Sequence, residues 1–188
     1  LDTCWRKNAW EKRISRIVVK SSTFTVRARQ ILERWPDAKL VLVVRDPLDA
    51  IPSGMSLLTG VLDKAYGALT TTREADRKRW LENLYQGSVV IYRQIYEEQQ
   101  AGLIPPGSLH VVTYPSLVGD LEATMSKLMA FLELEVRPEF AMKLAEAAGA
   151  QRGHRSKHAY DLAQFGLTRE RILSDLGFVY GAYGLPRP

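Results

Sequence analysis

The sequence has few of the features that mark several common classes of protein. It contains one cysteine, Cys4, so no disulfide can form within the chain and nothing indicates an oxidising compartment. No apolar run is long enough to span a membrane, and the first residues do not form a signal-peptide pattern. We therefore expect a cytoplasmic protein without a membrane span.

Glycine and histidine are scarce where some nucleotide and metal sites need them. No glycine precedes Gly54, and no GxxxxGK[ST] phosphate-binding loop occurs in the sequence. The three histidines, His110, His154 and His158, have no cysteine or carboxylate at ligand spacing, so we predict no metal site. The histidines and serines also form no evident nucleophile–base–orienter set.

The overall composition indicates one globular domain over residues 1–188. Hydrophobic residues make up 46% of the chain and charged residues 25%, which are ordinary values for a protein with a real core. The net charge of +5 suits an anionic ligand but is too small to indicate nucleic acid, and we predict no nucleic-acid partner. The sequence does not define an oligomeric state.

Alternating strand and helix patterns predict an α/β fold. A short β-branched run at 16–19 is followed by a helical pattern at 23–35 and by the strongest strand, at 39–44. That last run is continuously apolar, which predicts a strand covered on both faces, as in a parallel sheet. Strand, helix and strand in this order form a βαβ unit. A third strand is predicted at 109–114.

The remaining segments are predicted to be mostly helical. After the 39–44 strand, Asp46 is a candidate N-cap and Pro47 a candidate first helical residue, while Pro52 should distort the helix. The segment 59–100, a loop to about residue 72 and then a long helix, is expected to frame an acceptor pocket. Further helices are predicted at 118–132, 138–148 and 168–176.

Arg45 and Ser53 form the first candidate site. Ligands of open α/β sheets bind at the carboxyl ends of the strands, and Arg45 directly follows the 39–44 strand. The helix that starts there offers unpaired N–H groups and the positive end of its dipole to an anion. Ser53 lies two turns further on and faces the same anion if the helix bends. The alternative is a structural ion pair of Arg45 with Asp46 or Asp49.

Lys20 is the second candidate, because it follows the predicted strand at 16–19. Two strands of one sheet that each end in a cation place two positive charges at one edge, which favours an anion site. The alternative is a surface lysine whose aliphatic stem lies along apolar residues at a strand end.

Two further features fit a nucleotide. The loop at 151–166 is basic and contains Arg155, Ser156 and Lys157, which can wrap an anion with side chains and backbone N–H groups. The alternative is a solvated basic loop. Tyr114 ends the third predicted strand, where its ring either stacks on a base or fills the core.

Taken together, these stretches resemble the sulfotransferase family, most closely its bacterial-type branch. An Arg-Asp-Pro motif with a serine eight residues after the arginine is fairly specific for that family, and its combination with the other stretches in this order is more so. The stretches are VVKSS at 18–22, WPDAKLVLVVRDPLDAIPSGMSL at 35–57, HVVTYPSLVGD at 110–120 followed by FLELE, and RSKHAYDLAQFGL at 155–167.

The resemblance implies a P-loop-like parallel sheet flanked by helices and the co-substrate 3′-phosphoadenosine 5′-phosphosulfate. It implies that Arg45 and Ser53 hold the 3′-phosphate and that Tyr114 lies near the adenine. It also implies that Lys20 leans toward the sulfuryl group that is transferred. Arg155, Ser156 and Lys157 fall in the loop that the family closes over the 3′-phosphate.

Residues 1–188 depart from the family pattern in two respects. The strand–loop–helix unit that cradles the 5′-phosphosulfate in the family is not found, so the expected fold is partial and activity of these residues alone is in doubt. The family often places a proline after Lys-Ser and a histidine nearby, where this sequence has Ser22, Thr23 and Phe24. The residue that deprotonates the acceptor is therefore not identified.

The expected function is sulfuryl transfer to a hydroxyl or amine of a small-molecule or glycolipid-type acceptor. Three alternatives stay open. One is a catalytically degenerate module that keeps nucleotide binding and has lost the reaction. Another is a P-loop kinase-like phosphoryl transferase, which would need a magnesium ion and a Walker loop. The third is a basic nucleic-acid binder, which would bind polynucleotide more tightly than the small nucleotide and with a steep salt dependence.

Overall fold

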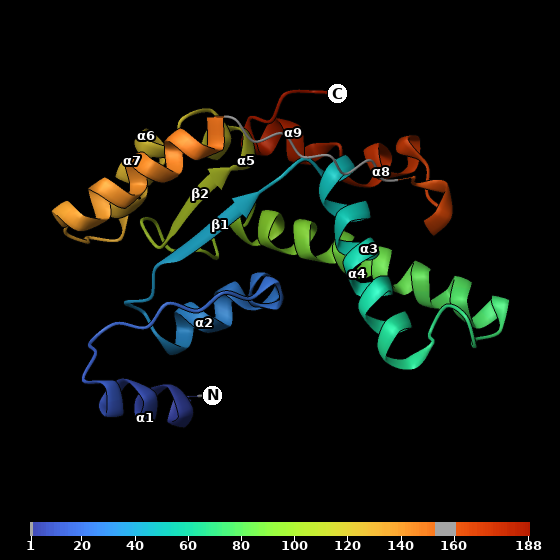
Figure 1. Ribbon diagram of the computed structural model, residues 1–188, viewed down its shortest axis with the longest axis horizontal. Helices are drawn as coiled ribbons and strands as arrows, with labels where there is room; N and C mark the ends of the chain where they lie inside the picture. The colour runs from blue at the N-terminus through green and yellow to red at the C-terminus, as the bar shows by residue number, and fades with distance from the viewer. Residues whose placement is uncertain (1, 153–160) are drawn as a thin grey trace.

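The computed structural model describes residues 2–152 and 161–188 and has an α/β fold that is mostly helical (Figure 1). The described part of the chain forms one sheet of two parallel strands, β1 (Leu40–Val44) and β2 (Leu109–Thr113), in a register that runs from Leu40 opposite Leu109 to Val44 opposite Thr113. The helices are α1 (Asp2–Lys12), α2 (Ala28–Arg34), α3 (Pro47–Tyr66), α4 (Glu74–Gln100), α5 (Tyr114–Gly119), α6 (Leu121–Phe131), α7 (Pro138–Arg152), α8 (Arg169–Leu176) and α9 (Phe178–Tyr183), with 3₁₀ helices η1 (Ser22–Arg27) and η2 (Ala163–Phe165).

The predicted strand at 16–19 is wrong. Residues 16–20 are not part of any strand, and the side chain of Val18 is 93% exposed. β-Branched residues favour extended backbone, but a strand also needs a neighbour for its backbone hydrogen bonds, and the described sheet pairs β1 with β2 alone. The βαβ unit predicted over 16–44 therefore does not form. Two of the three predicted strands are present.

β1 is present within one residue of its prediction, but it is covered on one face only. Leu42 packs against the core and Val44 is part of it, whereas Val41 and the 58% exposed Val43 face outward. The continuous apolar run therefore does not mark a strand buried on both faces here. Because side chains alternate along a strand, a single covered face is enough to explain the observed pattern.

The turn from β1 into α3 forms as the sequence predicts. Asp46 is the N-cap of α3, its carboxylate accepts from the backbone N–H of Leu48 at 2.8 Å, and Pro47 is the first helical residue. The helix then continues through Pro52, whose ring is fully buried, and ends only at Tyr66. The predicted start of a loop at residue 59 is therefore wrong. The stop is Gly67, whose φ of 62° lies in the left-handed region that favours glycine.

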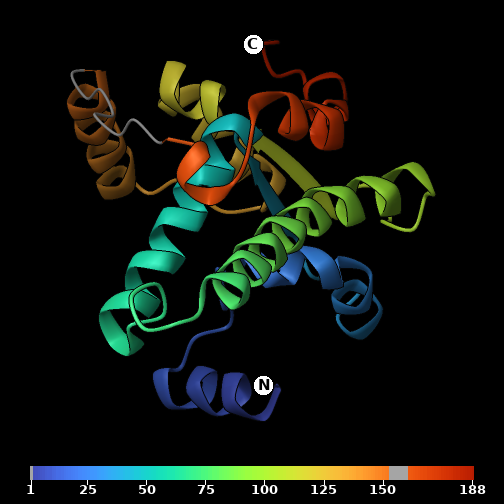
Figure 2. The same ribbon diagram turned by 90° about the vertical axis from the view of Figure 1, so that its right-hand side faces the viewer.

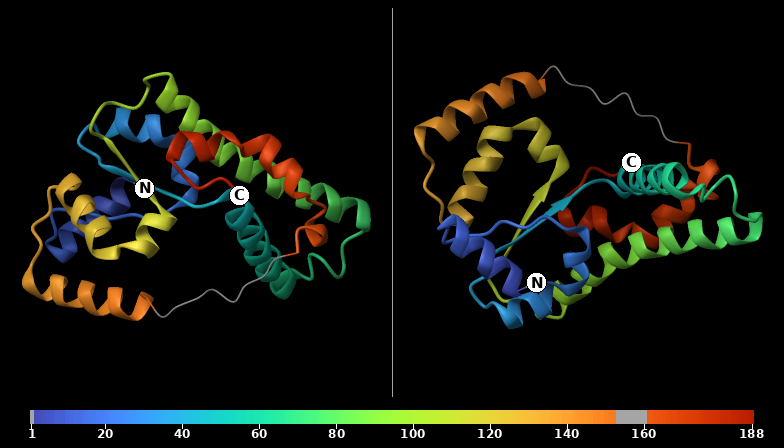
Figure 3. Two further views of the ribbon diagram at one scale, coloured as in Figure 1. Left: turned by 90° about the horizontal axis from the view of Figure 1, so that it is seen from above. Right: turned by 60° about the horizontal axis from the view of Figure 1, so that its bottom comes forward.

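The other helices largely match their predicted ranges. The long helix predicted at 73–100 is α4, which in Figure 2 (green) runs from the middle of the molecule to its right-hand side. Thr168 caps α8 by accepting from the N–H of Arg171 at 3.2 Å. Helix α9 was not predicted; Figure 3 shows α8 and α9 running beside α4.

The main core lies beneath the carboxyl end of β1, where α3, α4, α8 and α9 meet. Its most enclosed side chains include Ile51 and Met55 of α3, Tyr85 of α4 and Ile172 of α8, all exposed by 2% or less. This packing fixes the start of α3 against the last helices of the chain. No helix of the described residues is both long and apolar enough to cross a membrane.

Candidate nucleotide-binding site

Arg45 and Tyr114 lie side by side at the carboxyl edge of the sheet. Each is the first residue after its strand, and the parallel register brings the two strand ends together. The guanidinium carbon of Arg45 is 4.8 Å from the centre of the Tyr114 ring, within range of a cation–π contact. Tyr114 is 38% exposed, so it does not fill the core. It begins α5 rather than ending β2.

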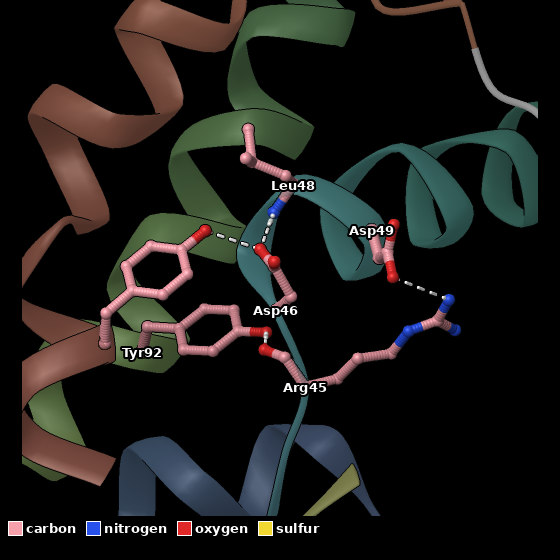
Figure 4. Close-up of polar contacts among 6 residues, drawn as sticks. Arg45, Asp46, Leu48, Asp49 and Tyr92 are labelled. Atoms are coloured by element: carbon pink, nitrogen blue, oxygen red, sulfur yellow. Dashed lines mark hydrogen bonds and ion pairs between the residues drawn. The ribbon is translucent and has the colours of Figure 1, made fainter. Parts of the chain in front are cut away.

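The ion pair of Arg45 with Asp49 is also present. Nη2 of Arg45 lies 3.3 Å from Oδ2 of Asp49, one turn into α3 (Figure 4). This is a single long contact in which the Asp49 side chain is 60% exposed, and pairs of this kind contribute little stability. Nε of Arg45 is buried and has no hydrogen-bond partner among the described residues. The Asp49 carboxylate takes one bond from the guanidinium, and the Arg45 side chain is 33% exposed, so other N–H groups of the fork remain accessible to a further acceptor such as a phosphate oxygen.

Ser53 lies on the same side of α3 as Asp49. The two are four residues apart within the helix, which places them about one turn apart, and Arg45, two residues before the helix begins, reaches Asp49 through the ion pair. Ser53 is half-buried. A ligand that contacts both Arg45 and Ser53 therefore also meets the Asp49 carboxylate, so the ion pair given above as an alternative lies within the candidate site.

Lys20 is not at the sheet edge. It is exposed, and it lies in the extended segment that precedes η1 rather than at the end of a strand. The predicted pair of cations at one edge therefore does not form from Lys20 and Arg45, because the strand that was to carry Lys20 is missing from the sheet. Arg155, Ser156 and Lys157, the predicted closing loop, lie outside the described residues.

Two tyrosines that the sequence did not single out hold the backbone around Arg45. The hydroxyl of Tyr92, on α4, donates to the carbonyl oxygen of Arg45 at 3.0 Å (Figure 4). The hydroxyl of Tyr180, on α9, donates to Oδ1 of Asp46 at 2.5 Å. Burial is the main cause that raises the pKa of both phenols well above 10, and the Asp46 carboxylate adds to it. Both phenols therefore remain protonated donors at neutral pH.

The family model described as "Sulfotransferase family" matches residues 2–138. The chain belongs to the sulfotransferase family.

Curated relatives and a solved structure agree with this membership. Two relatives, both named omega-hydroxy-beta-dihydromenaquinone-9 sulfotransferase Stf3, come from Mycobacterium bovis and Mycobacterium tuberculosis. Each is 26% identical over 123 residues, which is 65% of this chain and 30% of the relative. The crystal structure of sulfotransferase STF9 from Mycobacterium avium aligns with a TM-score of 0.71 at 16% identity, over 87% of this chain and 41% of that one. The chain thus spans less than half the length of these proteins, and the structural match shows the shared fold.

For this sulfotransferase-family chain, the residues present fit the phosphate end of a nucleotide. A cation with a buried unpaired Nε, an aromatic ring on its face and a helix N-terminus all meet at one sheet edge. The described residues contain no group of three or more histidine, cysteine, aspartate or glutamate side chains that could hold a metal ion.

The predicted acceptor region at 59–100 contains a cavity. A cavity of about 290 Å³ lies at the turn between α3 and α4, where Trp80 is one of its lining residues. Ala68, Thr72, Asp76 and Arg77 line the rest of it. Tyr85, by contrast, is fully buried in the core, so it frames no pocket.

Proposed function

We propose that this chain carries the 3′-phosphate half of the donor site of a sulfotransferase that uses 3′-phosphoadenosine 5′-phosphosulfate. The observation that supports this most directly is the pairing of Arg45 with Tyr114 at the carboxyl edge of the sheet, with Nε of Arg45 buried and unpaired. In this proposal Arg45 and Ser53 bind the 3′-phosphate oxygens and Tyr114 packs against the adenine. The loop with Arg155, Ser156 and Lys157 adds donors to the same phosphate.

The reaction we propose is in-line transfer of the sulfuryl group through a loose transition state, by analogy with phosphoryl transfer. Such a transition state asks the protein for positioning and for cations near the bridging and equatorial oxygens. Lys20 is our candidate for one of those cations. Its position in an exposed segment leaves it accessible to a ligand, and no described residue forms an ion pair with it.

We propose that the acceptor is a hydroxyl group on an apolar molecule. The relatives' printed name describes a hydroxylated menaquinone as the molecule that they sulfate. On α3, one turn beyond Ser53, the side chains of Leu57, Leu58 and Val61 are exposed by 46 to 67% and continue toward the end of the helix. An apolar chain that lies along them gains about 25 cal/mol of binding free energy for each Å² of apolar surface that it buries. Transfer of a labelled sulfuryl group to a long-chain prenyl alcohol, but not to a matched amine or sugar, tests this class.

The experiment that tests the donor site is calorimetric titration with 3′,5′-diphosphoadenosine and with 5′-AMP. We expect Arg45→Ala to weaken binding of the first at least tenfold and to change the second little, because only the first carries the 3′-phosphate. Arg45→Lys should recover part of the loss, since lysine keeps the charge without the planar fork. An equal loss for both nucleotides contradicts the 3′-phosphate role.

The same experiments separate the alternatives. A degenerate module binds 3′,5′-diphosphoadenosine but transfers no sulfuryl group from 3′-phosphoadenosine 5′-phosphosulfate. A nucleic-acid binder prefers polynucleotide, with an affinity that falls steeply with salt. A kinase-like enzyme instead prefers ATP and requires magnesium.

A further inference from the structure

The strand–helix turn that carries Arg45 is held from outside by two helices that are distant in sequence. Tyr92 reaches it from the middle of α4 and binds the carbonyl oxygen of Arg45 itself. Tyr180 reaches it from α9, 134 residues beyond Asp46, and binds the Asp46 carboxylate. The same Oδ1 accepts the N–H of Leu48 and so caps α3 (Figure 4). The Tyr92 phenol therefore holds the backbone just after β1, and the Tyr180 phenol holds the N-cap of α3.

Both phenols are placed to hold the Arg45–Asp46 turn rather than to contact the ligand. Tyr180 is only 3% exposed and packs in the core below the turn. The oxygen of Tyr92 is used by the backbone of Arg45, on the opposite side of the residue from its guanidinium (Figure 4). The guanidinium has looser contacts of its own, the Tyr114 face and one long bond to Asp49. Its position thus depends on where the backbone of Arg45 is held.

We propose that Tyr92 and Tyr180 are positioning residues for the nucleotide site, holding the Arg45–Asp46 turn so that the guanidinium meets the 3′-phosphate. This inference rests on the donor site proposed above. It gives α9, through Tyr180, a role in the preference for a nucleotide that carries a 3′-phosphate. A positioned cation binds a phosphate at its best geometry, whereas a displaced one loses the alignment of its N–H donors.

The chain offers a matched control for each tyrosine on the same helix. Tyr183 of α9 donates to Oε1 of Gln99 at 2.8 Å, and Tyr85 of α4 donates to Oδ2 of Asp175 at 2.6 Å. Neither bond touches the turn. Tyr183→Phe and Tyr85→Phe therefore each remove one partly buried phenol hydrogen bond without releasing Arg45.

The test is titration of the four phenylalanine variants with 3′,5′-diphosphoadenosine and 5′-AMP, together with urea unfolding of each. We expect Tyr92→Phe and Tyr180→Phe to weaken binding of 3′,5′-diphosphoadenosine about three- to tenfold and to leave 5′-AMP within twofold. The two controls should leave both affinities within twofold, even where they lower stability by a similar amount. In an Arg45→Ala background, the two positioning variants should cause no further loss, because the group they position is gone.

The outcomes separate this inference from the proposed function. If the wild-type chain does not prefer 3′,5′-diphosphoadenosine to 5′-AMP, the donor site itself is wrong and the inference goes with it. If the wild-type preference exists and survives both Tyr92→Phe and Tyr180→Phe, the positioning role alone is overturned. The positioning role is also overturned if the control variants reduce this preference as much as Tyr92→Phe and Tyr180→Phe do.

Discussion

Nη2 of Arg45 lies 3.3 Å from the carboxylate of Asp49, so the cation at the sheet edge already has an anion beside it. Asp49 also lies one turn before Ser53 along α3. A nucleotide phosphate that binds both Arg45 and Ser53 must share the guanidinium with this carboxylate or displace it. Asp49 therefore lowers the affinity for a phosphate in the proposed site, by competition and by charge repulsion.

We expect Asp49→Asn to bind 3′,5′-diphosphoadenosine a few-fold more tightly than the wild type at low salt, with the gain shrinking at high salt because salt screens exposed charges. Helix α3 should lose a little stability, since Asp49 is an acidic residue in its first turn. Calorimetric titration at two salt concentrations measures the effect. Glu97→Gln changes the net charge equally at an exposed position of α4 and serves as the control. Weaker binding by Asp49→Asn would show that Asp49 orients Arg45 rather than competing for it.

Two substitutions of Tyr114 distinguish a contribution of its aromatic ring from a contribution of its hydroxyl group. Tyr114→Leu removes the aromatic face that contacts the Arg45 guanidinium and that we propose packs against the adenine, so we expect binding of 3′,5′-diphosphoadenosine to weaken about two- to fivefold. Tyr114→Phe keeps the ring and should bind 3′,5′-diphosphoadenosine within twofold of the wild type. Fluorescence or calorimetric titration of both variants measures the difference. Equal affinities for the leucine and phenylalanine variants would remove the ring from the site.

Ser53→Ala tests the second predicted phosphate contact. A hydrogen bond to a charged group contributes about 1.5–3 kcal/mol, so we expect at least a tenfold loss of affinity for 3′,5′-diphosphoadenosine and little change for 5′-AMP. Ser56→Ala is the matched control, because Ser56 lies on the same helix but falls outside the four-residue series of Arg45, Asp49 and Ser53. A similar loss in both variants would point to damage to α3 rather than to a phosphate contact.

Lys20→Ala should lower turnover more than donor binding in a preparation that transfers sulfuryl groups. The reason is that a cation aimed at the transferring group acts mainly in the transition state. The measurement is kcat beside the affinity for 3′,5′-diphosphoadenosine. Lys12→Ala removes an exposed lysine at the end of α1 and controls for net charge. Unchanged kcat with Lys20→Ala would remove the role from Lys20.

The Glu82–Arg171 pair predicts a pH dependence of stability. Arg171 of α8 forms two hydrogen bonds with the Glu82 carboxylate of α4, at 3.0 and 2.6 Å, and its guanidinium lies 4.5 Å from the centre of the Tyr85 ring. The bond from Arg171 is the first cause that lowers the pKa of Glu82. A carboxyl whose pKa is lowered by folding stabilises the fold above its unfolded pKa, and this contribution is lost as the pH falls through the folded pKa.

We therefore expect Glu82→Gln to lower the free energy of unfolding by about 0.5–1 kcal/mol at pH 7, since the pair is partly exposed. As the pH falls through the lowered pKa of Glu82, the wild type and the variant should converge. Urea unfolding over a series of pH values from 7 downward measures this. Glu74→Gln breaks a pair with Lys78 inside α4 and should have the smaller effect, because no second helix is attached. A difference that persists unchanged at low pH would contradict the electrostatic explanation.

The turn that contains Arg45, Asp46 and Pro47 was predicted from the sequence more accurately than the strands of the sheet. Arg45, Asp46 and Pro47 could be read correctly because strand end, N-cap and first helical residue are decided within a few positions of each other. The strand at 16–19 failed because pairing depends on a neighbour that no local pattern specifies. Tyr92 and Tyr180 gave no signal at all, since each lies in a helical stretch where an aromatic residue usually means core.

What the sequence by itself determined is the order of elements around Arg45, the family to which the chain belongs, and the residue types that suit a phosphate. Those depend on local backbone preferences and on a motif of fixed spacing. The tertiary structure alone decided that Tyr114 lies against Arg45, that Lys20 stays off the sheet edge, and that a phenol from the last helix holds Asp46. The physical reason is that strand pairing and helix packing join residues many positions apart, and their partners are chosen by burial and hydrogen bonding in the folded chain.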